Sequence, residues 1–289
     1  MTDTSSSREA YLAAFRLATA ANKAYRGGEE ESPLTDEQYD ALIDQLQALG
    51  EANGWSDHEV LVQAVSGGVT DGDGDVQHRT RMLSLAKAQN GDELDKFLKK
   101  AREFSAQLLL EPKLDGLAIN ASYLNGELVQ VSTRGDSRTG QNVTSRALEA
   151  TITGLPKTIP FKGDLEVRGE LFMLRSHFEA AQKFRVKHGR PEYKNPRNAV
   201  SGAILSKDAS RLEGLKMTYA IYDYIVYSPE NKEDSYHQLM REAANAGFTP
   251  ALSLMPSITG STIMERVIAF GEIRDSVGVP TDGVVVKVN

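Results

Sequence analysis

The spacing of hydrophobic residues divides the chain into two parts. From about residue 8 to residue 65, apolar residues recur at the interval of an α-helix, which predicts a small helical unit. One of its helices is expected to run from Asp36 to Leu49 and to end at Gly50. Thr35 and Gln38 fit a capping box at the start of this helix.

After residue 92 the pattern changes, and apolar positions begin to alternate with polar ones as they do in strands. A helix over 93–104 leads to a hairpin in which the turn residues Asn125-Gly126 join strands at 117–123 and 128–133. Further strands are predicted at 165–173, 217–226 and 283–288, and further helices at 176–188 and 235–246. The sequence therefore predicts an α+β fold with antiparallel sheets flanked by helices.

A glycine- and aspartate-rich stretch over 67–75 separates the two parts and is expected to be a loop. We therefore expect two domains, a helical one over 1–72 and an α+β one over 73–289. The polar N-terminus and the lack of a long apolar stretch favour a cytoplasmic protein with no membrane partner. The sequence gives no indication of the oligomeric state.

The charge balance limits how the chain can meet nucleic acid. With 33 basic and 40 acidic residues the formal net charge is −7, so bulk electrostatics does not favour DNA, and contact requires a local patch. One such patch lies over 183–197, where there is one acidic residue and six basic ones: Lys183, Arg185, Lys187, Arg190, Lys194 and Arg197. The chain has no cysteine, which excludes disulfides and thiolate metal sites.

The strongest indication of chemistry is the segment Glu111-Pro112-Lys113-Leu114-Asp115-Gly116, expected between two strands with a glycine where the backbone turns beside a ligand. Taken alone, this segment also fits a surface loop with a solvated lysine. Four further motifs follow it in order: Thr133-Arg134-Gly135-Asp136, Glu166-Val167-Arg168-Gly169-Glu170, Asn195-Pro196-Arg197-Asn198 and Asp282-Gly283-Val284-Val285-Val286-Lys287. Together they resemble the motifs of the NAD-dependent bacterial DNA ligases, and the resemblance runs from about Tyr25 to Asn289.

The resemblance implies an adenylation domain, which is a nucleotidyltransferase with an ATP-grasp-like ligase fold. In this family a lysine at the position of Lys113 attacks the α-phosphate of NAD with Mg²⁺ present, keeps the AMP and releases nicotinamide mononucleotide. This is the first step of nick sealing in DNA replication and repair. The catalytic residues implied are Lys113, Asp115 and Lys287.

The resemblance also implies binding residues for both halves of NAD. Glu111 and Tyr222 match adenine contacts, Arg134 and Glu170 match contacts to the nucleotide sugar, and Lys287 matches a contact to the α-phosphate. The remaining implied residues are Ser84, Leu85 and Gly116 around the nucleotide, Asp282 with Asp115 for Mg²⁺ or for orienting the lysine, and Tyr25, Asp36, Tyr39 and Asp40 for nicotinamide mononucleotide.

Helix geometry gives the nicotinamide prediction separate support. Asp36, Tyr39 and Asp40 stand at positions i, i+3 and i+4, so they share one face of a helix and can converge on a cationic ring and its ribose. Two alternatives stay open. Asp36 also suits the helix dipole, and Tyr39 also continues the apolar stripe.

The chemistry needs a neutral amine at Lys113. A lysine has a pKa of about 10.4 in water and is protonated at neutral pH. Burial and a nearby cation, either Mg²⁺ or Lys287, are expected to lower that pKa. For Glu166, Arg168 and Glu170, a solvated strand face with paired charges is the alternative to a functional site.

The resemblance implies further domains beyond Asn289, so we expect the adenylation half-reaction from these residues and no complete nick sealing. Nicked double-stranded DNA would be reached through those domains and the patch at 183–197. Two positions differ from the family: Arg26 stands in place of a histidine and Leu205 in place of an arginine. Two alternatives remain, a non-catalytic NAD-binding subunit of a split ligase and an adenylyltransferase acting on RNA or protein.

Overall fold

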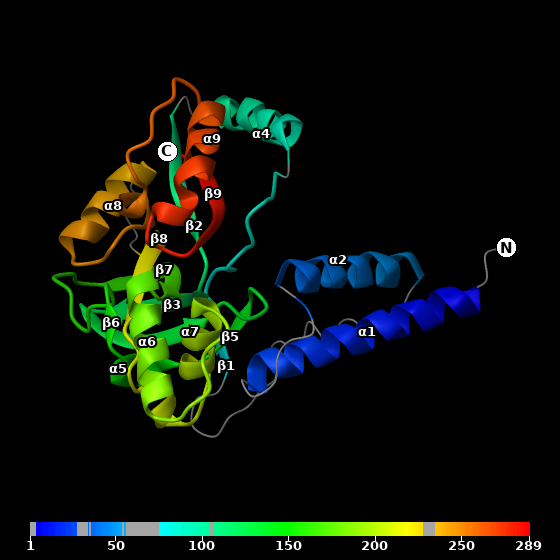
Figure 1. Ribbon diagram of the computed structural model, residues 1–289. Coiled ribbons are helices and arrows are strands. Elements are labelled where there is room, and N and C mark those ends of the chain that lie inside the picture. The colour runs from blue at the N-terminus through cyan, green and yellow to red at the C-terminus, as the bar shows by residue number, and fades with distance from the viewer. Residues whose placement is uncertain are drawn as a thin grey trace.

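The computed structural model describes residues 4–27, 34, 36–53, 55, 75–88, 90–104, 107–227 and 235–289. Within them, strands and helices form a mixed α/β structure with antiparallel sheets (Figure 1). The strands are β1 (Asp75–Gln77), β2 (Leu108–Leu114), β3 (Leu117–Leu124), β4 (Glu127–Thr133), β5 (Thr139–Gln141), β6 (Ile152–Thr153), β7 (Asp164–Phe172), β8 (Met217–Tyr227) and β9 (Thr281–Val288).

The helices account for the remaining regular structure of the described residues. Three short 3₁₀ turns accompany them, η1 (Ala209–Leu212), η2 (Ala251–Leu254) and η3 (Arg274–Ser276). The α-helices are α1 (Thr4–Gly27), α2 (Asp36–Asn53), α4 (Gly91–Phe104), α5 (Thr144–Glu149), α6 (Arg175–Lys187), α7 (Pro196–Ile204), α8 (Tyr236–Asn245) and α9 (Ile263–Ile273). In the part of the chain that the structure describes, no helix is long and apolar enough to span a bilayer.

The largest sheet has the order β4-β3-β7-β8-β6, with antiparallel neighbours except for the parallel pair β6–β8. Alternate residues on its strands, such as Ile119, Val167 and Tyr219, are fully buried and pack with α5, α6 and α7. Because strand side chains alternate between faces, the residues between them form a second face. That face is polar, and it carries Asn120 opposite Arg168.

The predicted hairpin is confirmed. Asn125 and Gly126 connect β3 to β4 with φ angles of 52° and 89°, the positive values that a type I′ turn requires at both central residues. This turn pairs Leu124 with Glu127, and a register shift between Ser122 and Tyr123 moves the pairing by one residue, so that Ile119 faces Thr133.

A second, two-stranded sheet pairs β2 with β9. A small apolar core of Phe172, Ala220, Ala251 and Val279 joins it to the large sheet. Lys113 lies on β2 itself and pairs with Gly283, whereas the sequence placed it between strands. β2 is longer than expected because its pairing with β9 continues to Leu114. Only the next two residues form the turn to β3.

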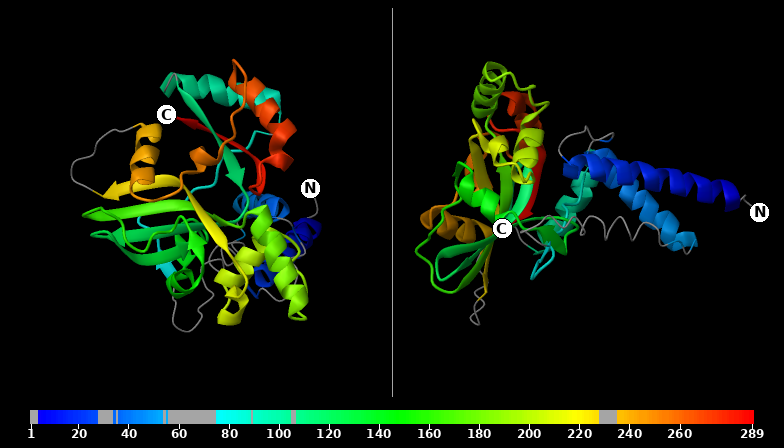
Figure 2. Two further views of the ribbon diagram at one scale, coloured as in Figure 1. Left: turned by 60° about the vertical axis from the view of Figure 1, so that its left-hand side comes forward. Right: turned by 90° about the horizontal axis from the view of Figure 1, so that it is seen from below.

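The helices α1 and α2 pack against each other through buried Tyr11 and Leu46, and they project to one side of the sheets (Figures 1 and 2). The predicted stop at Gly50 is wrong, because α2 continues to Asn53. The added turn carries the chain to Trp55. The centre of its ring lies 5.0 Å from that of Tyr11, and its backbone N–H donates to the Gly50 carbonyl. This packing outweighs the cost of about 0.5–1 kcal/mol for glycine within a helix. Thr35 of the predicted capping box and the predicted loop at 67–74 lie outside the described residues.

Candidate active site around Lys113

Lys113 stands near the end of β2, where the strand turns toward β3. Its side chain is 36% exposed, and its amine forms an ion pair with the carboxylate of Asp282 on β9. Lys113 pairs with Gly283 on β9, and the register of the two strands shifts between Lys113 and Leu114. Asp282, the residue before Gly283, falls at this shift and therefore lies beside the lysine. The second sheet therefore holds the amine at its open end.

The turn after Lys113 is fixed from two sides. Asp115 accepts a hydrogen bond of 3.0 Å from Nη1 of Arg197, in the first turn of α7. Gly116 lies so close to β7 that a Cβ there would be 2.2 Å from the carbonyl oxygen of Leu171. Only glycine fits this contact, so the predicted close backbone approach at Gly116 is present, and it is made to the protein itself.

Glu170 lies on β7 beside this turn, opposite Ala118. Burial raises the pKa of Glu170 to about 8, while the positive charges of Arg197 and Arg134 and a hydrogen bond from the backbone of Gly116 act in the opposite direction. The three side chains are therefore close enough to interact electrostatically. The contact of Glu170 and Arg134 with the nucleotide sugar remains a prediction.

The raised pKa of Glu170 predicts how stability depends on pH. Because the folded carboxyl binds its proton more tightly than the unfolded one, it lowers stability as pH rises from about 4.5 toward 8. Glu170→Gln is expected to raise the free energy of unfolding by less than about 1 kcal/mol at pH 5 and by about 5 kcal/mol at pH 9. Thermal melts of both proteins across this range measure the difference, and parallel pH curves would contradict the assignment.

Glu111 and Lys287 form a buried pair on the same face of the β2–β9 sheet as Lys113. The Lys287 amine lies 2.9 Å from Oε2 of Glu111, and it donates to the Tyr222 carbonyl at 2.7 Å and to the Tyr236 hydroxyl at 2.8 Å. Tyr236 in turn donates its hydroxyl hydrogen to Oε1 of Glu111. Burial lowers the pKa of Lys287, and the charge of Glu111 opposes that shift.

These contacts differ from the environment expected for Lys113. Its side chain is partly exposed, and its charged neighbour is the acidic Asp282. Lys287, expected as the nearby cation, uses its three amine hydrogens on Glu111, Tyr222 and Tyr236. The structure thus holds the amine in place, and it does not show the burial that the sequence analysis expected.

The other predicted residues are not joined to this cluster. Ser84 and Leu85 are exposed on the extended segment 81–88, and their place around the nucleotide remains a prediction. The backbones of the four residues predicted for nicotinamide mononucleotide belong to α1 and α2, and their side chains lie outside the described part of the structure: Tyr25, Asp36, Tyr39 and Asp40.

Glu166 and Arg168 contradict the alternative of a solvated strand face. Their exposed fractions are 3% and 6%, and Nη2 of Arg168 lies 3.5 Å from Oε2 of Glu166. Arg168 also donates to the carbonyl oxygens of Thr80 at 2.6 Å and Arg81 at 3.0 Å. The charges are paired, as that alternative proposed, but they are covered because the segment after β1 crosses the strand.

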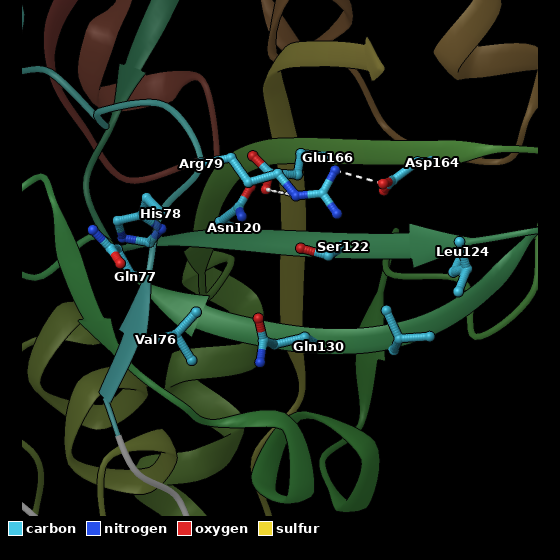
Figure 3. A pocket seen from close by; sticks show the side chains of 11 residues that line it. Val76, Gln77, His78, Arg79, Asn120, Ser122, Leu124, Gln130, Asp164 and Glu166 are labelled. Carbon is cyan, nitrogen blue, oxygen red and sulfur yellow. Dashed lines mark hydrogen bonds and ion pairs between the residues drawn. The ribbon is translucent and has the colours of Figure 1, made fainter. Parts of the chain in front are cut away.

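A pocket of about 300 Å³ lies at the far end of the polar face (Figure 3). It lies between the segment at 76–79 and strands β3, β4 and β7, and ion pairs join Arg79 to Asp164 and Glu166 across it. Glu170 stands at the opposite end of β7. The pocket is therefore separate from the turn that carries Lys113.

The basic patch at 183–197 is partly occupied by internal contacts. Arg190 pairs with Glu213 at 2.7 Å, Arg185 lies 4.2 Å from the ring centre of Tyr193, and Arg197 holds Asp115. Lys183 and Lys187 are exposed. These three arginines therefore make contacts within the protein, and Lys183 and Lys187 are exposed cations of the patch.

Two residues of the site were not predicted as such. Arg197 was part of a recognised motif and of the basic patch, and its ion pair with Asp115 links α7 to the lysine turn. Tyr236 follows the N-cap Ser235 of α8, and nothing in the local sequence pointed to Glu111, 125 positions away. The packing of α8 against β8 brings them together.

The fold and the site define a mixed α/β protein in which two antiparallel sheets present a strand lysine among carboxylates and arginines, an arrangement consistent with a nucleotidyltransferase domain. The profile of the NAD-dependent DNA ligase adenylation domain matches residues 73–289. The chain belongs to this family.

Curated relatives cover nearly the whole chain. DNA ligase 2 of Pseudarthrobacter chlorophenolicus is 34% identical over 287 residues, which are 98% of this chain and 38% of the relative. DNA ligases of Rhodopseudomonas palustris (strain BisA53) and Campylobacter concisus are each 32% identical over 93% and 98% of this chain, and 38% and 43% of their own lengths. The chain thus spans about two fifths of the length of these relatives.

Proposed function

We propose that this chain carries out the adenylation half-reaction of an NAD-dependent DNA ligase. The amine of Lys113 attacks the α-phosphorus of NAD, a nitrogen–phosphorus bond forms, and the bond from that phosphorus to the bridging oxygen breaks. Nicotinamide mononucleotide leaves with the bond electrons, and the amine gives up its proton. The observation that carries the proposal is the position of Lys113, held by Asp282 at the open end of β2 beside the turn that Arg197 secures.

The surrounding side chains have separate parts in this proposal. Asp282 aims the amine, and Asp115 fixes the turn through Arg197. Arg134 and Glu170 contact the nucleotide sugar, and their proximity to each other supports this. Transition-state charge develops on the phosphoryl oxygens, where Lys287 would supply a compensating positive charge.

Adenine binding is proposed at Glu111 and Tyr222. The buried carboxylate of Glu111 can accept from an amino group, and the ring of Tyr222 offers a stacking face beside it. The contact of Lys287 with the Tyr222 carbonyl, together with its ion pair to Glu111, supports this placement because it brings all three residues to one spot.

Mg²⁺ is proposed as the metal of the reaction. Among the described residues no three acidic or histidine side chains form a metal cluster. This fits an ion held mainly by substrate phosphates and water with one or two carboxylates. The proposed carboxylates are Asp282, which pairs with the amine, and Asp115, on the turn that follows Lys113. When bound, Mg²⁺ supplies positive charge to the transferring phosphoryl group.

Nicotinamide recognition is assigned to the N-terminal helical domain, residues 1–72, and nucleotidyl transfer to an ATP-grasp-like domain over 73–289. The helical spacing of Asp36, Tyr39 and Asp40 within α2 supports the first assignment. The two antiparallel sheets that meet at Lys113 support the second. The acceptor of the AMP in the complete reaction is nicked DNA, approached from the side of the exposed lysines of the patch at 183–197.

Two labelled forms of NAD test the proposal. Label in the adenine half is expected to remain on the protein, whereas label in the nicotinamide half is expected to leave as free nicotinamide mononucleotide. Retention of both labels indicates a binding subunit without chemistry, and transfer of the adenine label onto added RNA or protein indicates a different acceptor. The first result contradicts the proposed half-reaction, and the second contradicts nicked DNA as the acceptor of the AMP.

A further inference from the structure

His78 follows β1, and its ring lies against the turn that carries Arg134. Nε2 of the ring lies 3.1 Å from the Arg134 carbonyl oxygen, although the two residues are 56 positions apart in the chain. The backbone N–H of His78 donates to the Arg138 carbonyl at 2.8 Å, so His78 contacts both ends of the turn. Only 7% of the residue is exposed. His78 is therefore a buried contact that the turn receives from a separate segment of the chain.

The strand that follows the turn leaves space for the ring. The pairing of β1 with β5, in which Val76 faces Gly140, brings the two segments together. A Cβ on Gly140 would lie 3.0 Å from Nε2 of His78 and 1.7 Å from the carbonyl oxygen of Thr133. Glycine at this position therefore permits both the close approach of the strand and the contact with the ring.

The contact with Arg134 determines which nitrogen of the His78 ring carries the hydrogen. A carbonyl oxygen can only accept, so Nε2 is the donor, and in a neutral ring Nδ1 is then without a hydrogen. Burial lowers the pKa of His78, which favours the neutral ring. Nδ1 is buried and has no hydrogen-bond partner among the described residues. An unsatisfied buried nitrogen lowers stability, so stability alone does not explain a histidine here.

The backbone of Arg134 is held on both sides. Its N–H donates to the Ala118 carbonyl of β3 at 3.0 Å, and its carbonyl accepts from His78 and from the N–H of Ser137 at 3.2 Å. The Ser137 bond lies within the turn, whereas the His78 bond joins the turn to the segment after β1. The N–H of Met82 joins the same two segments by donating to the Ser137 carbonyl at 2.8 Å. Of these two links between segments, the His78 bond is the one made to Arg134 itself.

The guanidinium of Arg134 lies near two residues of the proposed nucleotide site. Burial raises the pKa of both Glu170 and Tyr222, and the positive charge of Arg134 opposes both shifts. We infer that His78 is a positioning residue for nucleotide binding: its ring holds the Arg134 carbonyl, which keeps the guanidinium beside Glu170, where it can reach the nucleotide sugar. This inference rests on the proposed function for the ligand of Arg134.

The test measures single-turnover labelling of Lys113 by adenine-labelled NAD over a range of NAD concentrations. In His78→Leu and His78→Phe, which lack a donor, the concentration for half-maximal rate is expected to rise about ten-fold while the maximal rate changes less than about two-fold. A contact made equally in the bound and transition states affects only the first quantity. In His78→Gln the side-chain amide can donate in place of Nε2, so the concentration is expected to return to within about three-fold of the parent.

Tyr123→Phe is the matched control, because the buried Tyr123 also donates from its side chain to a distant backbone carbonyl, that of Pro156, at 2.6 Å. It is expected to label like the parent. Thermal melts show whether each variant folds. A parent-like half-maximal concentration in the folded donor-free variants overturns the inference, and so does a His78→Gln that recovers nothing. The same rise in Tyr123→Phe would show a general effect of lost stability and would also overturn it.

Calorimetric titration with AMP separates this inference from the proposed function. If NAD labels the parent and the His78 variants alike, the inference fails and the proposed function stands. If NAD labels none of them, the proposed function fails, and an AMP affinity about ten-fold weaker in His78→Leu than in the parent still upholds the inference. Equal AMP affinities overturn the inference, and a parent that binds no AMP overturns both.

Discussion

Replacing Lys113 by arginine is expected to reduce the formation of protein-bound AMP by at least roughly a thousand-fold, the scale on which loss of a nucleophile acts. Arginine keeps the positive charge and can keep the ion pair with Asp282, but its guanidinium does not lose its proton and is a poor nucleophile. The nucleotide contacts lie on other residues, so AMP binding is expected to change only a few-fold.

Lys162→Arg is the matched control, because Lys162 is exposed and lies outside the motifs that carry the resemblance. It is expected to label like the parent. The measurement is the rate of label transfer from adenine-labelled NAD to each protein. Substantial labelling of Lys113→Arg would show that another residue takes the AMP.

The second large effect is expected on stability, from Arg168→Met. This change removes the positive partner of buried Glu166 and the donors to the Thr80 and Arg81 carbonyls. Breaking a buried pair from one side costs about 3–5 kcal/mol, and Glu166 then keeps the more distant Arg79, at 4.0 Å, and the Tyr227 hydroxyl as partners. For a domain of this size the melting temperature is expected to fall by more than about 6 °C.

Arg190→Met removes the same type of side chain from a pair on the surface. Arg190 and Glu213 are 33% and 53% exposed, so water screens their interaction and the expected loss is below about 1 kcal/mol. Urea unfolding of both variants measures the two costs. Similar losses of unfolding free energy in the two variants would contradict the claim that burial makes the Arg168 pair more costly to break.

The long elements could be predicted because each carries a local signal. The hairpin followed from Asn125-Gly126 and the alternation around it, β7 from apolar positions that alternate with charged ones, and β8 and β9 from β-branched and aromatic residues. Three helices, α5, α7 and α9, were missed, although the starts of α7 and α9 are legible. Asn195 caps α7 with proline at the first helical position, and Thr262 with Glu265 forms the capping box of α9.

The short strands could not be predicted from local pattern. β1 and β5 have three residues each and β6 has two, which is too short for a period of two to be seen. β1 exists because Val76 meets Gly140, 64 positions later, and β6 because Ile152 lies beside Met217. Such pairings are decided by the folded chain as a whole.

The candidate site was predicted in its residue types and only partly in its contacts. The motif order placed Lys113, Asp282 and Glu170 in one region, and the fold brings them to the turn between β2 and β3. The pairing of Lys287 with Glu111 was not foreseen, because each was assigned to a different part of the ligand. The fold instead pairs these two buried charges with each other.

The most direct test of the central claim is mass spectrometry of the chain after incubation with NAD and Mg²⁺, followed by mapping of the modified peptide. The account predicts a gain equal to one AMP, carried by the peptide that contains Lys113. An unmodified chain, or an AMP carried by a peptide from elsewhere in the sequence, would contradict it.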